Sequence, residues 1–138
     1  MRRSAKAVMI GPLVAAAALM AMFARPPWTA LRIAGLVIAI ASFIFLTVAR
    51  VQLGNAFSVM PEARQLVTRG IYSRIRNPIY VFSAIGLAAL CLYVNMPVLL
   101  LGLLVLVPIQ YFRARAEGRV LETRFGEEYR QYKAATWF

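Results

Sequence analysis

Four long apolar stretches dominate this sequence and restrict what it can fold into. They cover residues 8–24, 33–49, 78–94 and 97–112. A helix of about 20 apolar residues crosses a hydrocarbon core of about 30 Å, and these stretches lie near the lower end of that length. In lipid, each spanning segment must satisfy its own backbone hydrogen bonds, so the stretches predict helices.

The composition supports a membrane protein rather than a soluble domain. Apolar residues make up 62% of the 138 residues and charged residues only 15%, which is far from the usual balance of a soluble fold. Strand-like alternation of apolar and polar residues is absent. We therefore expect an all-α, integral membrane helical bundle of about four transmembrane helices, forming a single domain over residues 1–138.

The positive charge is unevenly distributed along the chain, whose net charge is +11. In a four-span arrangement the N-terminus, the segment 50–77 and the tail 113–138 share one side, with 3, 5 and 6 Lys or Arg residues. Only Arg25 and Arg32 lie on the opposite side. The positive-inside rule then predicts a multi-pass protein with both termini cytoplasmic, and we expect a bacterial inner membrane.

The basic residues flank apolar stretches and form no basic face interleaved with aromatic residues. We therefore expect membrane lipids, and not nucleic acid, to neutralise them. The oligomeric state is left open by the sequence.

The residue inventory excludes several kinds of chemistry. The chain has no His and no Asp, its acids are five Glu, and Cys91 is its single cysteine. Ser–His–Asp triads and His-ligated metal sites are therefore excluded, and no metal site is predicted. Cys91 lies in an apolar stretch, where a small packing residue is the expected role.

Two polar segments interrupt the apolar pattern. Residues 50–77 contain glycines, a proline and five arginines, which predicts an interfacial loop, and a loop of this length in a small domain is typically functional. Residues 113–138 are polar but helical in pattern, which predicts a cytoplasmic helical cap with a break at Gly126. Residues 95–97 predict a tight turn between the last two spans, and Pro108 predicts a kink in the last one.

Three sequence blocks carry a more specific signal. Residues 53–58 read LGNAFS and residues 66–80 read LVTRGIYSRIRNPIY. The third block contains Glu117, Leu121, Phe125, Gly126, Tyr129 and Tyr132. Together they resemble the isoprenylcysteine carboxyl methyltransferase and phospholipid methyltransferase superfamily of integral membrane methyltransferases. The resemblance covers about residues 53–133.

The resemblance implies a methyltransferase that uses S-adenosylmethionine. Its acceptor would be a lipophilic or lipid-modified molecule in the membrane: an isoprenylcysteine carboxylate, a phospholipid amine or a small lipophilic compound. The cofactor-binding residues implied are Gly70, Tyr72, Arg76, Asn77, Pro78, Tyr80 and Glu117. The catalytic residues are not identified, and Arg76 and Glu117 are the candidates.

The chemistry of these side chains agrees with that cofactor. Arg76 and the backbone N–H groups near Gly70 and the start of the Pro78 helix suit a carboxylate, because guanidinium groups and helix N-termini bind anions. Glu117 suits the ammonium group or the ribose. Two tyrosine pairs, 72 with 80 or 129 with 132, offer ring faces to the adenine and the sulfonium.

Two positions depart from the superfamily pattern. Asn77 stands where the best-known members have His, and an amide forms hydrogen bonds but does not titrate near neutral pH. Gly118 stands where a second Glu is expected. The alternatives at that position are weaker cofactor binding, use of Glu122 one turn away, or loss of activity.

Other interpretations of the same features stay open. Arg76 can act as a topology determinant, and Glu117 can pair with Arg113 one turn earlier. For Glu127 and Glu128 we prefer a role at a helix N-terminus. The whole chain can also be a membrane sterol or enone reductase that uses NADPH, or a non-catalytic membrane interaction protein with the same fold.

Overall fold

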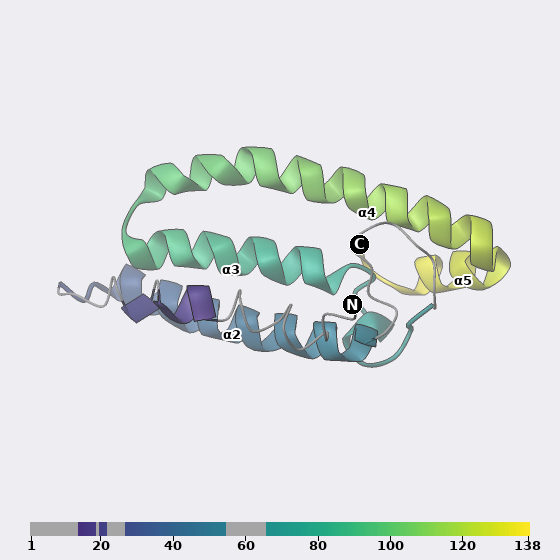
Figure 1. The fold of residues 1–138 in the computed structure, drawn as a ribbon, viewed down its shortest axis with the longest axis horizontal. Coiled ribbons are helices and arrows are strands. Elements are labelled where there is room, and N and C mark those ends of the chain that lie inside the picture. Colours follow the sequence, from purple (N-terminus) through teal and green to yellow (C-terminus); the bar gives the residue numbers. More distant parts are fainter. Residues whose placement is uncertain (1–13, 19, 22–26, 55–65) are drawn as a thin grey trace, which may run out of the picture.

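The computed structural model describes residues 14–18, 20–21, 27–54 and 66–138, and these residues are helical over most of their length (Figure 1). The helices are α2 (Ala30–Leu53), α3 (Pro78–Val94), α4 (Leu103–Phe125) and α5 (Glu127–Ala135), with 3₁₀ turns η2 (Gly70–Ser73) and η3 (Pro97–Gly102). Residues 14–18 and 20–21 are also helical. Within the described residues there is no β-strand, only an isolated bridge between Ile75 and Trp137. The predicted all-α class is confirmed.

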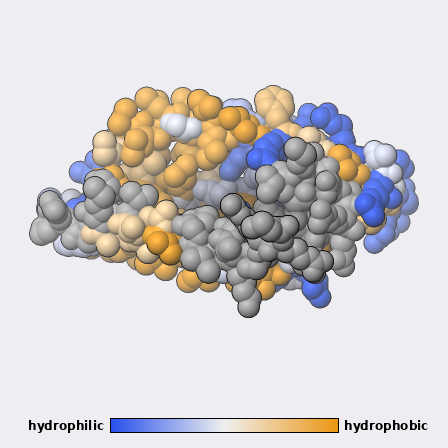
Figure 2. All heavy atoms as spheres, viewed as in Figure 1, coloured by the Kyte–Doolittle hydropathy of each residue, from blue (hydrophilic) through white to orange (hydrophobic). Residues whose placement is uncertain are grey.

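Two helices of the described part are long and apolar enough to cross a membrane. They are Ala30–Leu53, with 24 residues, and Val98–Phe125, with 28 residues, while Pro78–Val94 is apolar but shorter. Figure 2 shows apolar residues over the α3 and α4 side of the molecule and hydrophilic residues at the end where α4 meets α5. The predicted stretch 8–24 lies mostly outside the described residues, so the number of four spans stays a prediction.

The second predicted span is longer than expected at both ends. α2 begins at Ala30 because Thr29 caps it: the Thr29 hydroxyl accepts a hydrogen bond from the Arg32 N–H over 3.2 Å. Such a side-chain acceptor satisfies one of the free N–H groups of a first turn. The helix continues to Leu53 and ends at Gly54, whose φ of 51° favours glycine. The predicted interfacial loop therefore begins at Gly54 rather than at residue 50.

The last predicted span and the cap are not separate helices. Residues 97–102 form the 3₁₀ turn η3, and α4 then runs without interruption through Pro108 to Phe125. The helix therefore continues past the predicted span boundary at residue 112, as the helical pattern of the polar residues after it predicts. The break at Gly126 is confirmed: its φ is 53°, and α5 begins directly after it.

α2 and α3 pack closely through small residues. A Cβ atom on Gly35 would lie 2.8 Å from the backbone of Ala89 and of Tyr93, so the two helices approach each other too closely for a side chain there. Further along the same contact, the rings of Phe45 and Phe82 stack with centroids 5.1 Å apart. Small residues that bring backbones together are the usual basis of helix packing in membranes.

α4 packs against the rest of the described bundle far more sparsely. Ala114 is its one buried residue. The apolar window of Val98–Phe125 is 6% buried inside the molecule, against 22% for α2. Side-chain hydrogen bonds between α3 and α4 include one from Tyr80 to Glu117 and one from Gln110 to Ser83. Polar contacts therefore contribute to holding α4 in place.

The buried Arg32 joins α2 to the C-terminal end of α3. Its Nε donates to the carbonyl of Tyr93 over 2.9 Å and its Nη1 to the carbonyl of Pro27 over 3.0 Å. The guanidinium also lies 5.2 Å from the Trp28 ring and 5.3 Å from the Tyr93 ring. A cation at a helix C-terminus is favourable. Arg32 thus has a structural role at the end opposite to most of the basic residues.

Candidate functional site

The predicted site residues come together at one end of the bundle, where η2, the start of α3, the second half of α4 and α5 meet (Figure 1). Side chains link all four elements. Tyr80 of α3 contacts Glu117 of α4, Tyr132 of α5 contacts the backbone of Tyr72 in η2, and Arg76 contacts the backbone of Lys133. We call Tyr72, Tyr80, Glu117, Tyr129 and Tyr132 the tyrosine–glutamate cluster.

Glu117 is held by a hydrogen bond across two helices. The Tyr80 hydroxyl donates to Glu117 Oε1 over 2.5 Å, and both residues are partly buried. A hydrogen bond to an ionised acceptor is among the stronger ones in proteins. The structure therefore fixes one oxygen of the carboxylate of the one acid in this cluster.

Tyr72 lies at the centre of the cluster and is only 5% exposed. Its hydroxyl is the one buried side-chain polar atom of the described residues that has no hydrogen-bond partner. Burial raises the pKa of this hydroxyl well above its usual range, and the nearby Tyr132 and Glu117 add to the rise while Arg50 opposes it. A buried polar group without a hydrogen-bond partner costs free energy of folding, and a bound ligand that supplies the partner would explain it.

Arg76 provides positive charge beside the tyrosines of α5. Burial raises the pKa of Tyr132 to about 12, with Tyr129 adding to the rise and the charge of Arg76 opposing it. Burial likewise raises the pKa of Tyr129, where Arg76 again opposes the rise and Glu117 contributes to it. The charges of Arg76 and Glu117 therefore shift the pKa of Tyr129 in opposite directions, so the cluster lies near both a positive and a negative side chain.

The turn at Gly70 is fixed by Gln52 at the end of α2. Gly70 has a φ of 63°, and a Cβ atom there would overlap the side-chain amide of Gln52. The Gln52 Oε1 accepts a hydrogen bond from the Ile71 N–H over 2.8 Å. Gly70 is thus required both by its left-handed backbone and by the close approach of α2.

The last residues pair with the segment that leads into α3. The Trp137 N–H donates to the Arg74 carbonyl over 2.8 Å, and the Arg76 and Asn77 N–H groups donate to oxygens of Trp137 and Phe138 over 2.9 and 2.8 Å. The N–H groups of Ile71, Arg76 and Asn77 lie in the two places that were expected to bind a cofactor carboxylate. They are instead bonded within the chain, whereas the guanidinium of Arg76 keeps donors for a ligand.

Asn77 and Pro78 begin α3. Asn77 precedes the helix without a side-chain capping bond, and Pro78 occupies the first helical position, where its missing N–H costs nothing. Pro78 is almost fully buried. Both residues therefore contribute to the backbone at the entry to the cluster.

Gly118 lies against the Tyr129 hydroxyl. A Cβ atom at this position would be 2.8 Å from Tyr129 Oη, and Tyr129 is only 2% exposed. The departure from the superfamily pattern at Gly118 is therefore matched by a tyrosine that fills the space of a side chain. A glutamate at 118 would require Tyr129 to move.

The remaining acids of the third block form a surface network. Arg130 contacts Glu122 at 3.1 Å and Glu127 at 3.3 Å, and all three side chains are exposed. Glu127 and Glu128 lie in the first turn of α5, as preferred from the sequence. Glu122 is thus engaged with α5 and does not take the position beside Tyr80.

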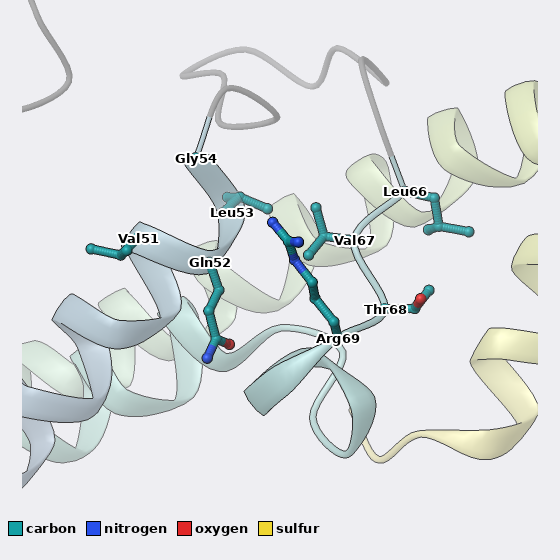
Figure 3. Close-up of a pocket in the computed structure, with 8 residues that line it drawn as sticks. All are labelled: Val51, Gln52, Leu53, Gly54, Leu66, Val67, Thr68 and Arg69. Carbon is teal, nitrogen blue, oxygen red and sulfur yellow. The ribbon is translucent and has the colours of Figure 1, made fainter.

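A pocket of about 410 Å³ opens between the end of α2 and the segment before η2 (Figure 3). It is lined by residues 51–54 and 66–69, with Gln52, Thr68 and Arg69 as the polar members. None of the predicted site residues lines it. Gln52 connects the pocket to the tyrosine–glutamate cluster. It lines the pocket, and its side chain accepts a hydrogen bond from the N–H of Ile71, next to Tyr72.

Sequence reasoning missed three contributors to this end of the molecule. They are Gln52, the packing of Tyr129 on Gly118, and the pairing of residues 137–138 with residues 74–77. A lone Gln at the end of an apolar stretch is a signal for the first, since an amide there needs a partner. The other two depend on contacts between distant segments and have no local signal.

Comparison with known proteins gives the family. The model of the phospholipid methyltransferase family matches residues 28–128, well over half of the chain. No curated protein and no solved structure matches it. The match includes α2, η2, α3 and α4, and with them every predicted site residue. It confirms the resemblance found in the three sequence blocks and implies a membrane methyltransferase. The chain therefore belongs to the phospholipid methyltransferase family.

Proposed function

We propose that the protein uses S-adenosylmethionine to methylate an acceptor that partitions into the membrane. The observation that carries this proposal is the buried hydroxyl of Tyr72, which has no partner among the described residues. The charge of Glu117 contributes to the raised pKa of this hydroxyl, and Tyr132 donates a hydrogen bond to the carbonyl of Tyr72. A buried polar group without a partner, beside a carboxylate and several aromatic rings, fits a site for a polar ligand with an aromatic part.

The side chains present fit the charges of this cofactor. The Arg76 guanidinium suits its carboxylate. Glu117, with one oxygen bonded to Tyr80, suits its ammonium group or ribose. The tyrosine rings suit the adenine and the sulfonium, since π-faces attract cations.

Methyl transfer from this cofactor requires correct positioning of the reactants more than it requires acid–base groups. S-adenosylmethionine supplies a methyl group on a positively charged sulfur, which transfers in line to a nucleophile. The residues of the chain hold the reactants close together and in line, and such positioning alone lowers a barrier strongly. Tyr80 fixes the direction of the Glu117 carboxylate. A carboxylate or thiolate acceptor needs no base, whereas an amine acceptor needs one, and Arg76 and Glu117 remain the candidate catalytic residues.

The place of the cluster suits an acceptor in the bilayer. It lies at the end of helices that expose many large apolar side chains, and a lipophilic acceptor reaches such a place from the membrane. The acceptor class is an isoprenylcysteine carboxylate, a phospholipid amine or a small lipophilic molecule. We place this end on the cytoplasmic side of a bacterial inner membrane, in a multi-pass protein with both termini cytoplasmic, because the basic residues gather there.

Ligand-dependent stability in detergent tests the function. We expect S-adenosylmethionine and S-adenosylhomocysteine to raise the melting temperature, because a ligand that binds only the folded state stabilises it. NADPH should have no effect. Stabilisation by NADPH alone would favour the reductase interpretation, and no effect of any of the three would favour a non-catalytic membrane protein.

A further inference from the structure

A second hydrogen bond between α3 and α4 lies deeper in the apolar part of the bundle than the tyrosine–glutamate cluster. Gln110 Nε2 donates to Ser83 Oγ over 2.8 Å. The Ser83 hydroxyl in turn donates to the carbonyl of Tyr80 over 3.0 Å. Neither Ser83 nor Gln110 belongs to the three sequence blocks or to the cluster, so the proposed function gives this pair no role.

The pair shares one face of each helix with the contact between Tyr80 and Glu117. Gln110 and Glu117 are two turns apart on α4, and Tyr80 and Ser83 are three residues apart on α3, which places each set on one side of its helix. Ala114, the one buried residue of α4, lies between Gln110 and Glu117. Helical side chains tilt toward the helix N-terminus, so Tyr80 reaches toward the start of α3, where Glu117 lies.

Apolar packing does not define how far α4 slides along α3. Only 6% of the apolar window of Val98–Phe125 is buried. An apolar side chain that faces lipid loses little when it moves along the bilayer, because lipid tails are as apolar as leucine. A slide by one turn, about 5.4 Å, would break both hydrogen bonds between the helices. The polar contacts therefore contribute to the register of α4, together with the short turn at residues 95–96.

We propose that Ser83 and Gln110 form a positioning pair, which keeps Glu117 in register with Tyr80 and Tyr72 without touching the ligand. The contact from Tyr80 to Glu117 alone is less suited to this task, because a ligand that binds Glu117 competes for the same carboxylate. The pair is uncharged and lies among apolar residues, so water does not compete with it. Its role in ligand binding rests on the proposed function, but its role in the register does not.

Cross-linking tests the register without any cofactor. In a Cys91→Ser background, Tyr80→Cys and Glu117→Cys remove the contact at the cluster and leave the hydrogen bond between Gln110 and Ser83 in place. We expect a short bifunctional thiol reagent to join the two cysteines, and adding Gln110→Leu to lower this cross-linking by about threefold or more. Thr47→Val is the matched control, because the Thr47 hydroxyl bonds to Phe43 within α2. Unchanged cross-linking with Gln110→Leu would overturn the proposal.

Ligand affinity then tests whether the register of α4 along α3 affects cofactor binding. In the otherwise native chain, Gln110→Leu and Ser83→Ala should weaken S-adenosylhomocysteine binding by about threefold to thirtyfold. Ser83→Thr keeps the hydroxyl and should retain the affinity, and Thr47→Val should leave it unchanged. A changed acceptor preference with unchanged affinity would overturn the proposal, because the pair would then touch the acceptor. If the native protein binds no S-adenosylhomocysteine while cross-linking still depends on Gln110, the proposed function fails and the positioning pair stands.

Discussion

The buried hydroxyl of Tyr72 lowers the stability of the protein without its ligand. A buried polar group that has no partner costs about 1 to 3 kcal/mol. Tyr72→Phe removes the hydroxyl and keeps the ring, which is 5% exposed. We expect the variant to unfold at a higher temperature than the native protein in the absence of ligand. If the hydroxyl also contacts the cofactor, the same variant should bind S-adenosylhomocysteine about tenfold more weakly.

Tyr132→Phe is the matched control for this substitution. It also removes one hydroxyl from the cluster, but that hydroxyl donates to the Tyr72 carbonyl over 2.7 Å. Its loss should lower the unfolding free energy by about 0.5 to 1.5 kcal/mol. Opposite signs in the two variants distinguish a hydroxyl without a partner from one with a partner. Equal affinity of Tyr72→Phe and the native protein would remove Tyr72 from the binding site.

The tyrosines of the cluster also predict how stability depends on pH. Burial raises the pKa of Tyr132 to about 12 and raises the pKa values of Tyr72 and Tyr129. An unfolded tyrosine has a pKa of about 10. Above that pH the unfolded chain loses these protons while the folded chain keeps them, so stability falls as pH rises from about 10 to about 12 and is fully present below. Unfolding in detergent across this range should show the fall, and Tyr132→Phe should make it smaller.

At the scale of the elements, the packing of α5 on α4 depends on Gly118. Helix propensity alone predicts that Gly118→Ala gains up to about 1 kcal/mol. The Cβ atom, however, would lie 2.8 Å from the hydroxyl of the buried Tyr129. Overpacking of this kind costs about 1 to 3 kcal/mol. We therefore expect Gly118→Ala to lower the melting temperature.

The double variant Gly118→Ala with Tyr129→Phe checks the cause. Removing the Tyr129 hydroxyl makes room for the new methyl group, since the next ring atom is 3.8 Å away. Part of the lost stability should return. Residues in contact couple in such a cycle, whereas independent ones add. Additive losses would show that the strain at Gly118 arises elsewhere.

Helix ends were predictable where the sequence contains a residue that ends a helix. α3 matches the predicted stretch because proline favours the first position of a helix, where Pro78 lies, and Asn95 takes the left-handed conformation, with a φ of 61°. Gly126 ended α4 for the same reason. Residue 112 was predicted as the end of a membrane span and not as the end of a helix, because polarity marks the edge of the membrane, and α4 continues beyond it. The length of a helix and the length of its apolar part are separate quantities.

The sequence identified side chains that the structure brings together, but it did not indicate how the backbone around them is bonded. The sequence blocks identified Tyr80 and Glu117, and the structure brings the two together. The Arg76 and Asn77 N–H groups were expected to bind a ligand and instead bond to residues 137 and 138. Pairing between segments that are about 60 residues apart depends on the tertiary fold, and no local pattern reports it.

At the scale of the whole molecule, the two ends of the bundle differ in chemistry. One end contains the tyrosine–glutamate cluster, the surface network around Arg130 and most of the described arginines. The other end contains Arg32, whose charge is used within the fold between α2 and α3. We expect the first end to face the cytoplasm, because the basic residues gather there.

Labelling of single cysteines in intact cells tests this orientation. In a Cys91→Ser background, Met96→Cys places a thiol in the turn between α3 and α4, where Met96 is 44% exposed. Thr123→Cys places one at an exposed position near the end of α4. The positive-inside rule predicts that a membrane-impermeant reagent modifies the first from outside and the second only after the membrane is permeabilised. We choose Met96 rather than Asn95 because Asn95 has a positive φ, which strains a cysteine. The reverse pattern would place the cluster outside the cell, away from its cofactor, and would contradict the proposed function together with the topology.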